Sequence, residues 1–257
     1  MITVARLSIA PVKGLRLLHP DAVEIGPSGV AGDRVFYLVD AEGRLANGKL
    51  AGELVQAEAR FDVASDRLTL TLPGGAVVEA DAGEGALGAA VETSFYGRPV
   101  TGRLVEGGFS AALSVVAGRE VRLVRADAVG AACDLLHPVS LLGRGSCEEL
   151  ARRSGNAALG DDRRFRMQVV LAGTRPHEED EWAGRRVRVG EVLLAVAGDV
   201  GRCVITGHDP DTGRTDADTL KEIAAYRGST AGRISFGRYA DVVEPGRIAV
   251  GDRVALA

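Results

Sequence analysis

Residues 185–205 read RRVRVGEVLLAVAGDVGRCVI, and this stretch indicates the fold class more clearly than any other. Valine recurs throughout it and glycine bounds its segments, a composition typical of β-strands separated by turns. The stretch therefore predicts strand structure that leads directly to a single cysteine, Cys203.

The neighbouring segments of the second half have the same texture. RFRMQVVLAG at residues 164–173 predicts a strand, and residues 236–257 predict a strand, a turn and a second strand. Two helices interrupt them. SCEELARRSGN begins with an S-x-x-E capping box formed by Ser146 and Glu149, with Gly155 placed to end the helix. DADTLKEIAAYRG predicts a further helix that stops at Gly228.

Short strands also dominate the first half. RLTLTLPGGAVVEA at residues 67–80 alternates strictly around a Pro-Gly-Gly turn, which predicts a hairpin. The small-residue segments at 83–92 and 107–118 predict two short helices. Glycines cluster at 107 and 108, so we expect a division near residue 110, with modules at 1–110 and 111–257.

Composition and charge exclude several classes of protein. Hydrophobic residues make up 46% and charged residues 26%, which predicts a folded soluble chain. The net charge of −4 argues against a nucleic-acid partner. No apolar run approaches the roughly 20 residues of a membrane helix, and the N-terminus does not resemble a signal peptide. We expect a cytoplasmic protein that binds neither nucleic acid nor membrane.

The three cysteines, Cys133, Cys147 and Cys203, form no CxxC pair. Their number and spacing argue against a disulfide framework and a structural zinc site. We interpret Cys133 and Cys147 as structural. Residue type alone makes Cys203 either an inert small hydrophobe or a reactive thiol.

The neighbours of Cys203 leave that alternative open. Arg202 would lower the thiol pKa if its guanidinium turned toward the sulfur. Adjacent side chains on a strand point to opposite faces, in which case Arg202 points away. The following DPDTG, residues 209–213, fails the EF-hand ligand pattern and predicts an Asp-Pro turn.

Several basic residues could bind an anion. The chain has no GxxxxGK[ST] loop and no GxGxxG that begins a helix. Lys13 in PVKG and Arg34 in GDR remain as candidates. On a strand, Arg164 and Arg166 of DDRRFR would share a face and could converge on one anion. The alternative is that these arginines are solvated surface residues.

Hydrolase signatures are weak, because the chain has no GxSxG elbow and its four histidines show no HExxH spacing. The acidic HEEDEW at residues 177–182 predicts a solvated loop whose Trp182 anchors it to the core.

Eight segments, taken together and in order, resemble MOSC-domain proteins of the two-part form, which include the mitochondrial amidoxime-reducing component and its bacterial relatives. The segments are APVKGL, GVAGDRVFYLVD, HPVSLLGRGSCEEL, DDRRFRMQVVLAG, HEEDEW, GRCVITGHDPDTG, LKEIAAYRG and VVEPGRIAVGDRV. The resemblance spans nearly the whole chain. It implies a mixed, β-dominated fold, with an N-terminal β-barrel-like module followed by a MOSC-type β-barrel with short helices.

The resemblance also implies a molybdenum cofactor (Mo-molybdopterin) between the modules, with one cysteine thiolate bound to molybdenum. Cys203 matches that ligand, and Lys13 and Arg34 match the basic residues that hold the pterin phosphate. Ser146, Arg166 and Gln168 match further cofactor-binding positions. Thiolate chemistry agrees independently, since soft sulfur ligands suit a redox-active metal, and a phosphate needs fixed basic donors.

Three positions depart from the family pattern. RFRMQ replaces RFRPN, so Gln168 offers an amide one methylene longer than asparagine. Gly14 replaces a serine found in some members, and Lys49 stands where arginine is common, which keeps the charge but loses the fork geometry.

The function implied is reduction of small N-hydroxylated or N-oxide substrates, with Cys203 as the catalytic metal ligand. The chain has no flavin, haem or iron–sulfur motif, so electrons would come from a separate donor protein of one of those types. Two alternatives remain: sulfur transfer through a persulfide on Cys203, and a non-catalytic cofactor carrier.

Overall fold

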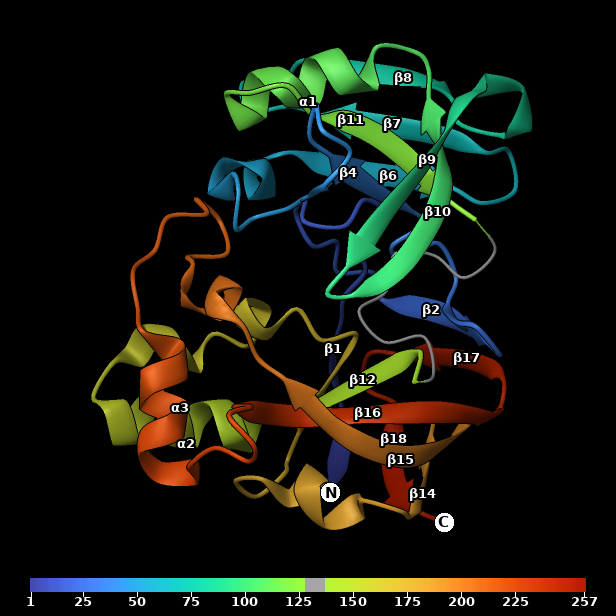
Figure 1. Cartoon of the computed structure of the whole chain (residues 1–257). Helices are drawn as coiled ribbons and strands as arrows, with labels where there is room; N and C mark the ends of the chain where they lie inside the picture. Colours follow the sequence, from blue (N-terminus) through green and yellow to red (C-terminus); the bar gives the residue numbers. More distant parts are fainter. Residues whose placement is uncertain (128–136) are drawn as a thin grey trace.

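Strands dominate the computed structural model, which describes residues 1–127 and 137–257. Figure 1 shows two parts, one built mainly from the first half of the chain and one mainly from the second. Three α-helices occur in the described residues. The predicted β-dominated fold is confirmed. Cys133 lies outside the described residues.

The second part is a closed seven-stranded barrel in which β12 and β13 are parallel and the other neighbours antiparallel. In barrel order the strands are β1 (Ile2–Leu7), β13 (Val169–Ala172), β12 (Val139–Gly143), β16 (Ser235–Glu244), β15 (Val192–Gly201), β14 (Arg186–Val189) and β18 (Arg253–Leu256). The valine-rich stretch supplies two adjacent strands, β14 and β15, as its composition predicts.

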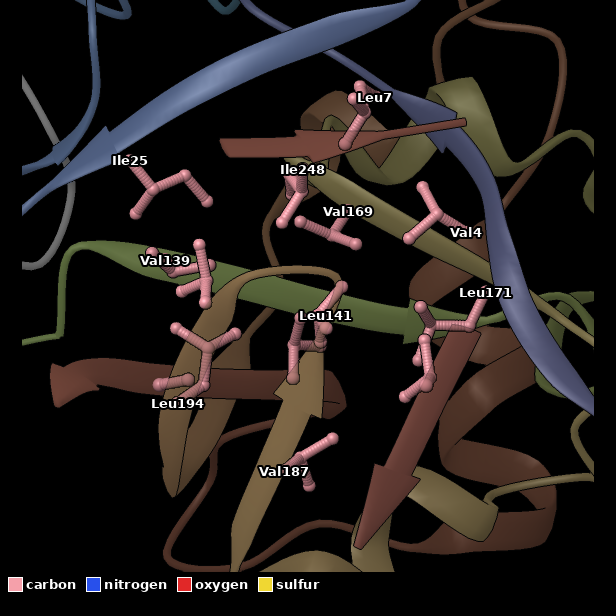
Figure 2. Packing of buried hydrophobic residues seen from close by; sticks show 14 of the residues in the cluster. Val4, Leu7, Ile25, Val139, Leu141, Val169, Leu171, Val187, Leu194 and Ile248 are labelled. Carbon is pink, nitrogen blue, oxygen red and sulfur yellow. The ribbon is translucent and has the colours of Figure 1, made fainter. Parts of the chain in front are cut away.

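The barrel interior is filled by branched aliphatic side chains from alternate positions (Figure 2). Val139 and Leu141 of β12 point inward, and so do Val187 and Val189 of β14. Burial of each such side chain stabilises the fold by roughly 1.5–3 kcal/mol. Trp182 also packs into this cluster, so the predicted anchoring by Trp182 is confirmed.

The first part encloses a second core between two sheets. One sheet has the order β5 (Leu45–Ala46), β4 (Phe36–Val39), β11 (Arg122–Ala126), β10 (Arg98–Val105) and β9 (Leu87–Phe95). The other contains β6 (Glu58–Asp62), β7 (Arg67–Thr71) and β8 (Val77–Asp81). The predicted hairpin is β7–β8, with Leu70 opposite Val78.

One predicted helix in this part is wrong and one is confirmed. Residues 83–92 form a short 3-10 helix, η2 (Glu84–Ala86), and most of edge strand β9. Strand β9 has a helix-compatible composition, but it pairs with β10 along nearly its whole length, and this pairing decides its structure. The second expected helix is α1 (Phe109–Ala117), which ends at Gly118 in the left-handed conformation.

The strand pairings do not follow a division at residue 110. Strand β11 pairs with β4 and β10 of the first part, and α1 packs beside it. Conversely, β1 closes the barrel of the second part. The small sheet of β17 (Gly246–Ala249), β2 (Ala22–Gly26) and β3 (Gly29–Val30) also joins both ends of the sequence. The N-terminal segment therefore ties the two parts together.

Two helices cover the side of the barrel. Helix α2 (Arg144–Ser154) ends at left-handed Gly155, as predicted, and α3 (Thr219–Arg227) ends at Gly228. The predicted capping box is wrong, because the N-cap position of α2 is Gly143, three residues before Ser146. Within the described residues, no helix is both long and apolar enough to cross a membrane.

Candidate functional site

A pocket of about 200 Å³ lies where the two parts of the chain meet. It brings together five of the six predicted site residues: Lys13, Arg34, Arg166, Gln168 and Cys203. Apolar residues complete its walls, among them Val55, Pro138, Phe165, Met167 and Ile205. The sixth predicted residue, Ser146, does not line the pocket.

Cys203 presents its thiol to this pocket. The residue has extended backbone at the entry to the 3-10 helix η6 (Val204–Gly207). Its carbonyl accepts hydrogen bonds from the backbone N–H of Thr206, at 3.1 Å, and from the Thr206 hydroxyl, at 3.0 Å. The side chain is a free thiol and is partly exposed. Cys203 is therefore held by its backbone while its sulfur stays accessible.

Arg202 is held by backbone carbonyl groups on the neighbouring elements. Its guanidinium donates to the carbonyls of Phe165 and Phe236, both at 2.8 Å, and lies 5.4 Å from the centre of the Phe165 ring. These contacts join the end of β15 to β16 and to the segment before β13. The contacts give Arg202 a structural role beside Cys203.

Lys13 and Arg34 supply positive charge from the first part of the chain. Lys13 is only 7% exposed, and its ammonium lies 5.3 Å from the centre of the Phe95 ring. Arg34 has left-handed backbone, pairs with Asp33 and donates to the Arg166 carbonyl at 3.0 Å. Arg166 in turn donates to the Leu15 carbonyl at 2.7 Å.

Asp33 organises this basic side, and the sequence analysis did not single it out. One carboxylate oxygen accepts from the Ala10 N–H at 2.7 Å, and the other accepts from Arg34 and from the Gln168 amide at 3.0 Å. Its place in the GDR motif beside Arg34 was the available signal.

Gln168 uses its whole amide inside the protein. Its nitrogen donates to Asp33 and to the Pro138 carbonyl, at 3.0 and 3.1 Å, and its oxygen accepts from the Ser140 hydroxyl at 2.6 Å. The longer side chain therefore reaches Asp33, and through it holds Arg34.

Arg164 and Arg166 do not share a strand face, so that prediction is wrong. Residues 162–165 form the 3-10 helix η4 (Asp162–Phe165), and Arg166 follows in the left-handed conformation. The Asp161 side chain accepts from the Arg163 N–H at 3.0 Å, a local bond that favours the turn over a strand.

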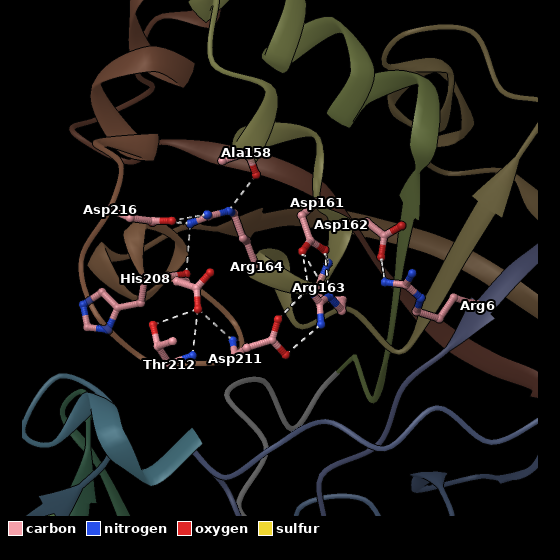
Figure 3. A network of polar contacts seen from close by, with 11 residues as sticks. Arg6, Ala158, Asp161, Asp162, Arg163, Arg164, His208, Asp211, Thr212 and Asp216 are labelled. Atoms are coloured by element: carbon pink, nitrogen blue, oxygen red, sulfur yellow. Dashed lines mark hydrogen bonds and ion pairs between the residues drawn. The ribbon is translucent and has the colours of Figure 1, made fainter. Parts of the chain in front are cut away.

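Arg163 and Arg164 also line the pocket, but their guanidinium groups take part in a network of ion pairs (Figure 3). Arg164 contacts both carboxylate oxygens of Asp216 at 2.7 and 2.6 Å, and its side chain is 2% exposed. Arg163 is bound by Asp161 and, through two bonds of 3.0 Å, by Asp211. We call these five residues the paired cluster.

The DPDTG turn docks the second part against the first. Asp209 accepts from the N–H and hydroxyl groups of Thr212, which lowers the pKa of its carboxyl. Gly213 has a φ of +74° and packs so closely on Gly52 of η1 (Gly52–Gln56) that a Cβ would collide with the Gly52 carbonyl. Gln56 donates to the Thr212 carbonyl at 3.1 Å. The predicted turn is confirmed, and it shapes the boundary of the pocket.

Ser146 of α2 is hydrogen-bonded to two residues of the HEEDEW segment. The Ser146 hydroxyl donates to Glu179 at 2.7 Å and accepts from the His177 N–H at 2.9 Å. The prediction of a solvated loop is wrong, because residues 178–182 form η5 (Glu178–Trp182) with Glu179 fully buried. Burial raises the pKa of Glu179.

Family models match both parts of the chain, and curated proteins are similar to nearly all of it. The model of the MOSC domain matches residues 132–255, and the model of the MOSC N-terminal beta barrel domain matches residues 1–103. Mitochondrial amidoxime-reducing component 1 of Mus musculus is 27% identical over 289 residues, covering 99% of this chain and 82% of that protein. The YuaD protein of Bacillus subtilis, a solved structure, has a TM-score of 0.44 and 14% identity, with 99% of this chain and 94% of that chain covered.

A second kind of relative is much longer. Molybdenum cofactor sulfurase of Danio rerio is 25% identical over 275 residues, covering 92% of this chain but 31% of that protein. The chain is thus related both to amidoxime-reducing components and to part of molybdenum cofactor sulfurases. Since the two family models together span nearly all of it, the chain belongs to the MOSC-domain proteins that carry an N-terminal MOSC beta barrel domain.

Proposed function

We propose that this protein is a molybdenum-cofactor-binding oxidoreductase that reduces small N-hydroxylated or N-oxide substrates. The observation that carries the proposal is one pocket in which the accessible thiol of Cys203 meets the basic side chains of Lys13, Arg34 and Arg166. The names of the relatives, an amidoxime-reducing component and a molybdenum cofactor sulfurase, support the same chemistry.

The donor set of the pocket fits such a cofactor. In residues 1–127 and 137–257, no group of three or more His, Cys, Asp or Glu side chains could hold a metal ion. A metal beside Cys203 would therefore bring its other ligands with it, and dithiolene sulfurs match the softness of a thiolate. Lys13 and Arg34 suit the phosphate end, because charge-assisted bonds to phosphate are short and strong.

Each residue then has a defined task. When bound, the cofactor supplies two-electron redox chemistry at molybdenum. Cys203 holds the metal, and Lys13 and Arg34 hold the phosphate. Asp33 and Gln168 fix the direction of the Arg34 guanidinium. A separate flavin, haem or iron–sulfur protein delivers the electrons.

The test is reduction of benzamidoxime by protein expressed in a host that makes the cofactor, with a chemical reductant in place of the donor protein. We expect benzamidine as product and no turnover by Cys203→Ser. Cys147→Ser is the matched control, because Cys147 lies on the buried face of α2 and burial raises its thiol pKa. Equal activity of wild type and Cys203→Ser would contradict the proposal.

Sulfur transfer is the second candidate, favoured by the accessible thiol and the sulfurase relatives. It predicts a metal-free protein with cyanide-labile sulfur on Cys203, and no benzamidoxime reduction. Bound cofactor without turnover would instead favour the non-catalytic carrier.

A further inference from the structure

The wall of the pocket contains a histidine hydrogen-bonded to an aspartate. His137 lines the pocket, and its Nδ1 lies 2.7 Å from a carboxylate oxygen of Asp241. Their side chains are 28% and 45% exposed, so both reach water. The ring of His137 also stacks on Tyr239, another pocket residue, with ring centres 6.2 Å apart.

Strand register builds this pair. Strands β12 and β16 are antiparallel, with Val139 opposite Ala240 and Ser140 opposite Tyr239. Val139 and Ala240 face the barrel core, whereas Ser140 and Tyr239 line the pocket. Asp241 follows two positions after Tyr239 and therefore lies on the same face of β16. The register of the barrel strands thus places Asp241 next to His137, which lies two residues before the start of β12.

The proposed reaction consumes protons in the pocket that His137 lines. Reduction of an amidoxime follows R–C(NH2)=N–OH + 2 e⁻ + 2 H⁺ → R–C(NH2)=NH + H2O, so the substrate needs a proton donor. Arginine side chains keep their protons at any ordinary pH, which excludes the pocket arginines as donors. A histidine oriented by a carboxylate is well suited to the role.

We propose that His137 donates the proton that the substrate nitrogen takes up, and that Asp241 is a positioning residue that directs the ring. The inference rests on the proposed function. Asp241 accepts the Nδ1 proton, so the imidazolium directs its Nε2 proton toward the substrate nitrogen.

The balance of the step is complete. The N–O bond breaks with two electrons that come from the separate donor protein, and the cofactor would supply the redox chemistry for this step. The nitrogen takes the His137 proton, and the oxygen leaves as water with a proton from solvent. The neutral ring then regains a proton from water. Among the described residues, Asp241 and Tyr239 of β16 contact the His137 ring. The pocket that His137 lines also contains these charged or titratable residues: Lys13, Arg34, Tyr96, Arg163, Arg164, Arg166, Arg202, Cys203, His208 and Asp209.

The test compares His137→Gln, Asp241→Asn and the control His19→Gln between about pH 5 and 8. His19 is exposed and does not line this pocket. We expect His137→Gln to lower kcat for benzamidoxime about 100-fold, with little change in KM, and to change the pH profile of the rate. Asp241→Asn should lower kcat about 10-fold, and His19→Gln should match wild type.

A second measurement is independent of turnover. Nitrogen NMR of labelled histidines identifies His137 by the signal missing in His137→Gln, and Asp241→Asn should shift that signal alone. Molybdenum content should stay unchanged in all three variants. Wild-type kcat and pH profile in His137→Gln, or an equal loss of activity in His19→Gln, would overturn this inference alone. A molybdenum-loaded wild type that reduces nothing would overturn the proposed function and this inference with it.

Discussion

The paired cluster and the basic side of the pocket both depend on arginine, but they differ in what surrounds it. In the paired cluster, Arg163 and Arg164 face three carboxylates. The buried Arg164 makes a bidentate contact with Asp216, which is partly exposed. Two residues further on, Arg166 contacts a backbone carbonyl. On the same side, Arg34 pairs with Asp33 and donates to the Arg166 carbonyl.

The difference shows how adjacent arginines acquire separate tasks. The left-handed backbone at Arg166, with a φ of +53°, turns its side chain away from the carboxylates that bind Arg163 and Arg164. We therefore expect the paired cluster to act mainly on stability, whereas under the proposed function Lys13, Arg34 and Arg166 act on cofactor binding. Four predictions test this contrast.

The largest effect is expected for Arg164→Met. This change leaves Asp216 without its partner and should lower the free energy of unfolding by about 3 kcal/mol, measured by urea denaturation. Arg166→Met is the comparison variant and should lower the free energy of unfolding by less; its hydrogen bond to the Leu15 carbonyl contributes about 1 kcal/mol. An equal loss of unfolding free energy in the two variants would contradict the distinction between the paired cluster and the basic side of the pocket.

Lys13→Met should weaken cofactor binding about tenfold or more, because a phosphate loses a charge-assisted bond. The measurement is pterin fluorescence of the purified protein after oxidation of the cofactor. Lys221→Met, on the exposed side of α3, is the matched control and should retain wild-type pterin. Wild-type pterin content in Lys13→Met would show that the phosphate binds elsewhere.

The contributions of His177 and of the paired cluster to stability should be lost in different pH ranges. Burial lowers the pKa of His177 from 6.5 to about 4, so its contribution to stability is present above pH 6.5 and is lost as pH falls toward 4. Burial raises the pKa of Asp161, but hydrogen bonds from Arg163 outweigh this and hold it below 3.8. The contribution of Asp161 should therefore persist to lower pH.

Urea denaturation at a series of pH values measures both effects. His177→Gln should flatten the curve between pH 6.5 and 4 and leave the steeper loss below pH 3.8. An unchanged slope in His177→Gln would show that other groups take up the protons in this interval.

The smallest effect is expected for Gln168→Leu. It removes one donor from Asp33 and loosens Arg34, so pterin affinity should fall about threefold, or roughly 0.7 kcal/mol. Gln56→Leu, which removes an exposed amide contact, should leave the affinity unchanged. A loss as large as that of Lys13→Met would mean that Gln168 contacts the cofactor directly.

The pattern of hydrophobic residues and glycines predicted the strands and helix ends that depend on neighbouring residues in the sequence. The alternating hairpin at 67–80 and the valine-rich strands have the expected structure, because side-chain periodicity decides which face is buried. The helix ends at Gly118, Gly155 and Gly228 were also predictable, because glycine adopts a positive φ readily. All three residues have a positive φ in the structure.

Tertiary contacts account for the errors. Strand β9 depends on pairing with β10, and the capping role of Ser146 gives way to a bond with buried Glu179, which lies 33 residues away. The position of Asp33 as a partner of both Gln168 and Arg34 likewise joins segments that are far apart in the sequence. The grouping of Lys13, Arg34, Arg166, Gln168 and Cys203 came from family resemblance, because no spacing rule connects residues 13 and 203.

The most direct test of the central claim is the number of molybdenum atoms and pterins per wild-type protomer, in protein purified from a cofactor-competent host. The arrangement of Cys203 with Lys13, Arg34 and Arg166 predicts close to one of each. It also predicts loss of the metal in Cys203→Ser and retention of both in Cys147→Ser. Folded wild-type protein with neither molybdenum nor pterin would contradict the account.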